Sequence, residues 1–165
     1  MLRKMEKCVD EDCLKREPYV ILISNMETFD REASAAVEKA QTSWDGITSV
    51  EYHNYGMARQ TERFEKAIQR GVKFRHLLFK PKEEQYVTEV SSSLKDPTSW
   101  EIRYLSNVNP LSLIILDKQE VFVSIENEDI AKTKKARWLR TNSPCILAMA
   151  KDCFETKWAA TESPS

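Results

Sequence analysis

The feature that most restricts the fold of this 165-residue chain is an apolar run late in the sequence, Leu111–Leu116, which is interrupted only by a serine. The polar residues 117–120 follow it, and a second, mostly apolar run, Val121–Ile125, comes next. Two strand-like runs on either side of a short polar turn predict a β-hairpin. Because a strand that is apolar at nearly every residue needs cover on both faces, we expect this hairpin in the middle of a sheet flanked by helices.

The chain before the hairpin alternates between strand-like and helix-like patterns. Strands are predicted at residues 19–23, 47–52, 72–79 and 100–104. Helices are predicted between them, one from Thr28 as its cap to Trp44, one over Met57–Arg70 and one over Pro81–Asp96. The first helix is expected to end at Asp45-Gly46, and His53–Gly56 is expected to be a loop after the second strand. This order predicts an α/β fold with a layered mixed sheet flanked by helices.

The chain after the hairpin predicts one more strand and a closing helix. Residues 137–141 are predicted as a short edge strand, and Ser143 followed by Pro144 is typical of a helix start, with Ser143 as the cap. The helix is expected to bury Ile146, Leu147, Ala150, Phe154 and Trp158. We therefore expect an N-terminal helical or linker segment at residues 1–17, one folded domain at 18–160 and a disordered tail at 161–165.

The composition excludes several classes of protein. With 25 basic and 26 acidic residues, the chain has no overall positive charge that would attract nucleic acid or an anionic membrane. No apolar segment approaches the roughly 18 residues of a spanning helix, and the charged residues 1–7 are unlike a secretory signal. We expect a cytoplasmic protein without a membrane partner.

Neither a metal nor a cofactor is predicted. The cysteines are Cys8, Cys13, Cys145 and Cys153. Their spacing fits no zinc site, and only two histidines, His53 and His76, are available to complete one, so we expect free thiols. The three glycines are too scattered for a phosphate-binding loop, and no Gly-x-Ser-x-Gly sequence is present.

The hairpin also carries a sequence motif. Residues 110–127 resemble the second half of the phospholipase D motif, H-x-K-x-x-x-x-D followed by a turn, a strand and G-S-x-N. Asp117 takes the aspartate position and Asn127 the asparagine position, whereas Pro110 stands in place of the histidine and Ser112 in place of the lysine. Because catalysis in that family needs a histidine nucleophile, the resemblance implies a retained fold without the chemistry, and we predict that the chain is not an enzyme.

A second resemblance covers roughly residues 18–160. The phrase Gly71-Val72-Lys73-Phe74-Arg75, the hairpin, and residues 138–144 before a closing aromatic helix resemble the effector domain of archaeal TrmB-type transcription regulators. This resemblance implies a non-catalytic phospholipase D-like domain that senses sugars or other small metabolites. Such regulators carry a winged helix-turn-helix ahead of this domain, and residues 1–17 are too short to form one. We therefore expect a separate DNA-binding or signalling protein as the partner, and a homodimer is left open.

The candidate ligand-binding residues follow from where small molecules bind in layered α/β sheets, outside the carboxyl ends of the strands. If the first strand of the hairpin runs antiparallel to its neighbours, as the resemblance implies, its start lies beside those ends. The predicted site then comprises His53, Asn54, Lys80, Asn107, Asn109, Ser112 and Asn127. These uncharged hydrogen-bonding groups and one cation suit a sugar, a sugar phosphate or a nucleotide, although each residue on its own is also explained as an ordinary polar loop residue.

Two other functions are weighed against sensing. The first is nucleic-acid association or scaffolding through a basic run, Lys132, Lys134, Lys135, Arg137 and Arg140, which can contact phosphates but is also typical of a solvated loop. The second is residual phosphodiesterase activity, which ranks last because the motif lacks its histidine and lysine. The sequence therefore predicts a non-catalytic regulatory domain that senses a small molecule and passes its bound state to a partner.

Overall fold

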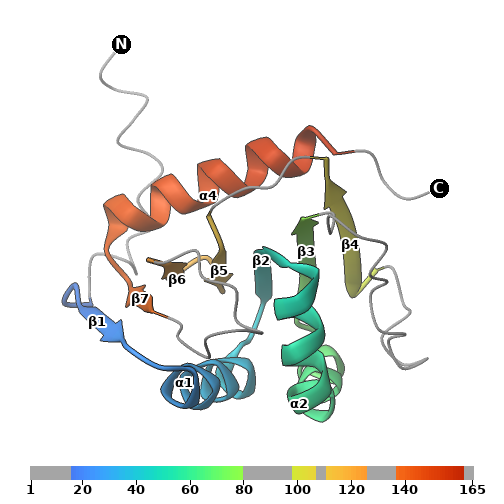
Figure 1. The fold of residues 1–165 in the computed structure, drawn as a ribbon, viewed down its shortest axis with the longest axis horizontal. Coiled ribbons are helices and arrows are strands. Elements are labelled where there is room, and N and C mark those ends of the chain that lie inside the picture. Colours follow the sequence, from blue (N-terminus) through green and yellow to red (C-terminus); the bar gives the residue numbers. More distant parts are fainter. Residues whose placement is uncertain (1–15, 80–97, 107–110, 126–136, 162–165) are drawn as a thin grey trace.

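The computed structural model describes residues 16–79, 98–106, 111–125 and 137–161 (Figure 1). Within these ranges the chain forms a seven-stranded sheet in the order β1-β7-β6-β5-β2-β3-β4. The elements in chain order are β1 (Val20–Ile23), α1 (Met26–Lys39), β2 (Ser43–Ser49), α2 (Val50–Gln69), β3 (Lys73–Phe79), β4 (Trp100–Leu105), β5 (Leu113–Leu116), β6 (Glu120–Ser124), β7 (Trp138–Thr141) and α4 (Pro144–Ala159). The predicted α/β fold with a late hairpin and a closing helix is confirmed, whereas the helix predicted over Pro81–Asp96 lies outside the described residues.

The sheet is mixed, and its two halves have different connections. Strands β2, β3 and β4 are parallel, whereas β5, β6, β7 and β1 continue the sheet with antiparallel pairings. Strand β5 lies antiparallel to β2, with Leu113 opposite Ile47. The start of β5 therefore lies near the carboxyl end of β2, as expected for the hairpin.

Helices cover both faces of the sheet. Helix α4 lies across one face and packs on β2, β5 and β6, while α1 and α2 lie on the other face (Figure 1). The core beneath α1 and α2 is aromatic, with the Phe29 ring stacked on Trp138 at 4.6 Å between centroids and edge-on to Phe122 at 5.9 Å. All four residues of β5 are buried, because this central strand is covered by helices on both sides.

The hairpin turn is tied to the loop before β2. Asp117 and Lys118 both have positive φ, 49° and 56°, and the amide of Gln119 donates to the carbonyl of Leu116 at 2.8 Å. The last strand pair is Leu116 with Glu120, so the hairpin loop has three residues, and the two with positive φ give it a left-handed backbone. The Asp117 carboxylate accepts hydrogen bonds from the amides of Gln41, Thr42 and Ser43 at 3.1, 2.8 and 3.0 Å. The conformation of the turn therefore places the Asp117 carboxylate where it holds the loop between α1 and β2.

Two predicted boundaries early in the chain are wrong. Helix α1 is capped by Asn25, whose side chain accepts from the amide of Thr28, and it ends at Lys39. Trp44 belongs to β2, where its indole packs edge-on against Phe64 at 5.7 Å. The prediction failed because an apolar residue at position 44 fits a helix and a buried strand equally well. In the structure it lies in a strand that pairs with β3 and β5 and is covered by helices.

The segment predicted as a loop after the second strand is also wrong, because it is helical. Helix α2 begins at Val50 directly after β2, and the side chain of Ser49 caps it by accepting from the amide of Tyr52 at 3.1 Å. His53 and Asn54 therefore lie in the first turns of a helix.

Two predictions for the last elements need correction. Strand β7 is not an edge strand, because β1 pairs with it on the side away from β6. Ser143 occupies the position before α4, but its side chain makes no capping hydrogen bond. The predicted apolar stripe of α4 is confirmed, since Leu147, Ala150, Phe154 and Trp158 are buried and Ile146 packs against them.

Candidate functional site

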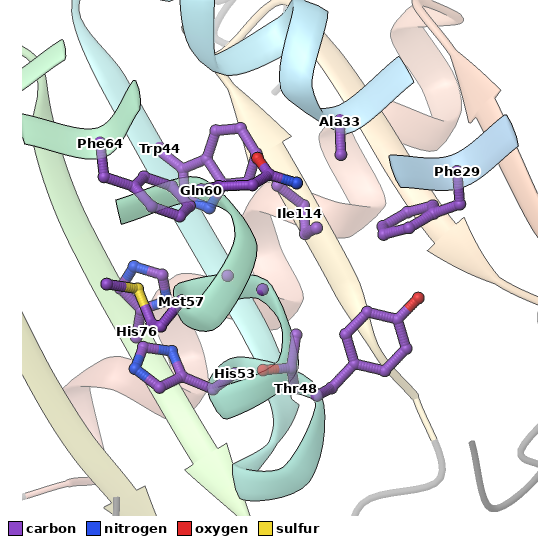
Figure 2. A pocket seen from close by; sticks show the side chains of 13 residues that line it. Phe29, Ala33, Trp44, Thr48, His53, Met57, Gln60, Phe64, His76 and Ile114 are labelled. Carbon is purple, nitrogen blue, oxygen red and sulfur yellow. The ribbon is translucent and has the colours of Figure 1, made fainter. Parts of the chain in front are cut away.

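A cavity of about 60 Å³, which we call the inner cavity, lies between α1, α2 and the sheet, on the face opposite α4 (Figure 2). Its lining is mostly aromatic and apolar and includes Phe29, Trp44, Tyr52, Met57, Phe64 and Ile114. Polar groups enter the lining from His53 and Gln60 on α2 and from His76 on β3. This cavity has room for a few waters and is far smaller than the roughly 300–1,000 Å³ of typical small-molecule sites.

The two histidines of the chain meet at this cavity. His53 is 6% exposed and His76 is 5% exposed, and their rings lie edge-on with 5.1 Å between centroids. Within the described residues, neither Nε2 atom has a hydrogen-bond partner, and the same holds for Oε1 of Gln60. Burial lowers the pKa of His53 to about 4, and burial together with the neighbouring His53 lowers the pKa of His76 well below its usual value. Both imidazoles are therefore neutral at pH 7.

This arrangement restricts the chemistry of the histidines. A neutral imidazole pair beneath a helix can hydrogen-bond water or a very small molecule, but a phosphodiester in solvent does not reach it. Two imidazoles are also a small ligand set for a metal, and no group of three or more His, Cys, Asp or Glu that could hold one lies in the described ranges. Cys145 and Cys153, the cysteines within those ranges, are free thiols as expected.

A much larger hollow, of about 680 Å³, lies at the amino ends of the parallel strands. Most of its lining comes from residues at or just before the starts of β2, β3 and β4, and Lys118 of the hairpin turn and Glu155 of α4 complete it. The strand residues are Thr42, Ser43 and Asp45 for β2, Lys73 and Arg75 for β3, and Thr98, Trp100 and Glu101 for β4. We call it the amino-end hollow. A second hollow of about 190 Å³ shares Asp45, Lys118 and Glu155 with it and adds Lys151 of α4.

An arginine network forms one wall of the amino-end hollow. Arg75 donates to both carboxylate oxygens of Asp45 at 2.7 and 2.8 Å, and it also donates to Glu155 on α4 at 2.6 Å. The guanidinium lies over the ring of Phe154, with 4.8 Å to the centroid. The hydrogen bond from Arg75 lowers the pKa of Glu155, and Lys118 adds a smaller effect in the same direction. This network joins the sheet to α4 at the hollow.

The structure places few of the predicted ligand residues. His53 lines the inner cavity, Asn54 follows it on α2, and Ser112 is half-buried just before β5, where its carbonyl accepts from the amide of Ser124 at 2.9 Å. Ser112 is not among the residues that line the inner cavity. The other four predicted residues, Lys80, Asn107, Asn109 and Asn127, lie outside the described residues. Their grouping at the carboxyl ends of the strands stays a prediction.

The basic run is likewise described only at its end. Lys132, Lys134 and Lys135 lie outside the described residues, and Arg137 is exposed. Arg140 forms ion pairs with Glu32 at 2.6 Å and Glu120 at 2.8 Å. These pairs engage its guanidinium within the fold, so Arg140 is a poor candidate for a phosphate contact.

Sequence reasoning missed the amino-end hollow and the histidine pair. His76 was used only to count possible zinc ligands, although its position in the strand Lys73–Phe79 puts it on the same face as the buried Phe74. The residues of the hollow come from strand starts, a hairpin turn and a helix, and no spacing in the sequence links them. The available signal was a lysine at the start of a predicted strand, Lys73.

No model of a protein family and no curated protein matches the sequence. Among solved structures, TrmBL2, an archaeal chromatin protein, is similar with a TM-score of 0.65 and 21% identity over 99% of this chain and 59% of that one. Nuc, a phospholipase D family member from Salmonella typhimurium, is similar with a TM-score of 0.67 and 16% identity over 90% of this chain and 99% of its own. NucT from Helicobacter pylori has a TM-score of 0.66 and 14% identity, covering 90% of this chain and 100% of its own.

These similarities show the fold. The chain has a phospholipase D-like fold, as predicted, and a TrmB-type protein is among its structural neighbours. It spans 59% of the length of TrmBL2. Within the described residues, no helix is both long and apolar enough to cross a membrane.

Proposed function

We propose that this phospholipase D-like domain is a non-catalytic regulatory module that binds a small metabolite and passes the bound state to a partner protein. The observation that carries the proposal is the amino-end hollow, whose volume of about 680 Å³ lies within the range of small-molecule sites. Charged and hydroxyl side chains line it, which suits a polar metabolite. The inner cavity is about a tenth as large and does not suit such a ligand.

The motif and the histidines support the absence of catalysis. Pro110 and Ser112 occupy the positions where phospholipase D enzymes have their histidine and lysine. The chain has no histidine besides His53 and His76, and both are buried beneath α2. Asp117, one of the two retained motif residues, directs its carboxylate to the amides of Gln41–Ser43. This aspartate therefore has a structural role that explains its presence without a reaction.

Contacts at the hollow support transmission to a partner. Glu155 belongs to α4, and Arg75 links it to β3, so a ligand in the hollow touches the helix that covers one face of the sheet. Arg103 of β4 donates to the carbonyls of Trp158 and Thr161 at 3.1 and 3.2 Å and holds the end of the same helix. A ligand that shifts these arginine contacts changes the surface that α4 offers to another protein. The partner we propose is a DNA-binding or signalling protein.

Nucleic-acid association is the second candidate function. It is favoured by one finding, that the structural neighbour TrmBL2 is described as a chromatin protein with a novel mode of DNA binding. The neutral charge balance of this chain and the engagement of Arg140 within the fold favour the metabolite instead.

A thermal-shift screen against sugars, sugar phosphates, nucleotides and short DNA tests the proposal. A metabolite present at 100 times its Kd stabilises the folded state by about 2.7 kcal/mol, which is an easily measured rise in Tm. The rise should disappear in Thr98→Tyr, which fills the hollow from the exposed turn before β4, and persist in Thr156→Tyr on the exposed side of α4. A response to DNA alone would move the function to the second candidate.

A hydrolysis assay tests the absence of catalysis. We expect no release of nitrophenol from bis(p-nitrophenyl) phosphate above the buffer rate, because no imidazole reaches the solvent at the motif. Turnover that co-purifies with the protein and is lost in His53→Gln would show that the domain is an enzyme.

A further inference from the structure

We infer that the amino-end hollow, together with the smaller hollow that adjoins it, binds a phosphate-bearing small molecule through Lys73, Lys118 and Lys151. The inference rests on the proposed function, since it names the ligand class of the same site. It places that ligand at the amino ends of the parallel strands. Ser112 and the start of β5 lie at the other end of these strands, near their carboxyl ends.

Two arginines, Arg75 and Arg103, already engage the three carboxylates of the hollow, which leaves one negative charge in excess before the lysines are counted. Asp45 is 3% exposed and is held by two hydrogen bonds from Arg75, which also pairs with Glu155. Glu101 pairs with Arg103 at 2.8 Å. The acidic side chains that line the site are therefore engaged by arginines of the sheet and do not repel an entering anion as free carboxylates would.

The lysines at the two hollows are available to a ligand. Lys73 begins β3, Lys118 is in the hairpin turn and Lys151 is on α4, so three separate segments present an ammonium group to the two adjoining hollows. In the described part of the chain, none of the three has an ion pair within 4 Å, although the charge of Lys118 is felt by Glu155. Lys73 and Lys118 are exposed at the rim, where their flexible stems can turn toward a ligand.

One hydroxyl near the lysines is without a partner. The hydroxyl of Ser43 is buried and has no partner among the described residues, whereas the hydroxyl of Thr42, just before β2, already donates to Asp117 at 3.1 Å. The backbone amides of both residues are already used by Asp117. Recognition must therefore come from side chains, and the ammonium groups together with the Ser43 hydroxyl match the several acceptor oxygens of a phosphate.

The charge of the site favours a phosphate over other ligands. Three lysines and two arginines against three carboxylates leave an excess of two positive charges, which a phosphate dianion offsets and a neutral sugar does not. A DNA duplex needs an extended basic surface, whereas this site is a hollow bounded by three carboxylates, Asp45, Glu101 and Glu155. The chemistry therefore fits one small phosphorylated molecule held inside the hollow.

Calorimetric titration at 50 mM salt tests this inference with glucose 6-phosphate, glucose, citrate and a short DNA duplex as probes. We expect glucose 6-phosphate to bind and glucose to bind at least about tenfold more weakly, because the charge supplies much of the attraction. Lys118→Gln should weaken glucose 6-phosphate about fivefold, and Lys73→Gln with Lys118→Gln together more strongly. Affinity should also fall as salt is raised.

The matched control is Lys66→Gln, which removes the same charge from the exposed side of α2, away from the hollow. It should leave binding unchanged, and circular dichroism should show that every variant is folded. Equal binding of glucose and glucose 6-phosphate, unaffected by the lysine variants, would overturn the inference while the proposed function stands. Binding of citrate or DNA in preference to glucose 6-phosphate, lost in the same variants, would overturn the phosphate class. Binding of none of the probes, together with an empty metabolite screen, would overturn both proposals.

Discussion

Lowering the pH from 7 to 5 should destabilise this protein through its two buried histidines. Burial holds the pKa of His53 at about 4 in the folded state, against 6.5 for an unperturbed histidine. Between these values the unfolded chain binds a proton that the folded protein does not, so the free energy of unfolding falls as the pH falls. The loss begins near pH 6.5 and is complete near pH 4.

The size of the effect follows from the pKa difference. Each histidine costs about 1.4 kcal/mol per pH unit within this window, which integrates to about 1.8 kcal/mol for His53 between pH 7 and pH 5. Burial and the neighbouring His53 also hold the pKa of His76 well below its usual value, so the loss for the pair should exceed that for His53 alone. The rings packed around the pair, from Phe64, Phe74 and Trp100, carry no charge that would oppose this.

Urea unfolding at pH 7 and pH 5, followed by tryptophan fluorescence, measures the loss directly. His53→Gln keeps a neutral hydrogen-bonding side chain that does not titrate, and it should reduce the loss between the two pH values by about 1.8 kcal/mol. His76→Gln should also reduce the loss, because its histidine too has a lowered pKa. Each variant is compared with itself at the two pH values, so any difference in its stability at pH 7 cancels. If the wild type and both variants lose the same free energy, the histidines are not buried and neutral as the structure has them.

Two further predictions concern the side chains that join the sheet to its surroundings. Arg75→Met should lower the free energy of unfolding in urea by about 3–5 kcal/mol, because it leaves the buried Asp45 without its partner. The control Arg63→Met breaks an exposed pair with Glu38 and should lower it by under about 1 kcal/mol. Equal losses would contradict the buried pair. Asp117→Ala should lower the free energy of unfolding by about 3 kcal/mol, because the amides of Gln41–Ser43 lose their acceptor. Asp117→Asn should recover part of that loss, because its amide oxygen still accepts a hydrogen bond and asparagine tolerates the positive φ. An asparagine variant no more stable than the alanine variant would refute this role.

Hydrogen bonding also explains the acidity of Asp117. Partial burial works to raise the pKa of its carboxyl, but the hydrogen bonds from Thr42, Ser43 and Gln41 outweigh burial and lower it. The carboxylate is thus ionised near neutral pH, where it holds the loop between α1 and β2. The sequence motif identified this residue, and the structure supplied its role.

The site was less predictable than the fold. His53 was selected as a polar residue at the end of a strand, and it does lie near the end of β2, but within a helix and directed into the interior. Its partner His76 and the lysines Lys73, Lys118 and Lys151 were not selected. Each comes from a different element, and the register between those elements decides that they meet.

The sequence by itself determined the elements whose signal is local. The apolar run Leu113–Leu116 with its polar turn required a covered hairpin, and the spacing of Leu147, Ala150, Phe154 and Trp158 required a helix against a core. Only the tertiary structure decided that Trp44 belongs to β2 rather than to the helix before it, that β1 rather than β7 is an edge strand of the sheet, and that a hollow opens at the amino ends of the parallel strands. The physical reason is that pairing and burial between segments distant in sequence override local propensity, and no spacing along a chain records which distant segment will be the neighbour.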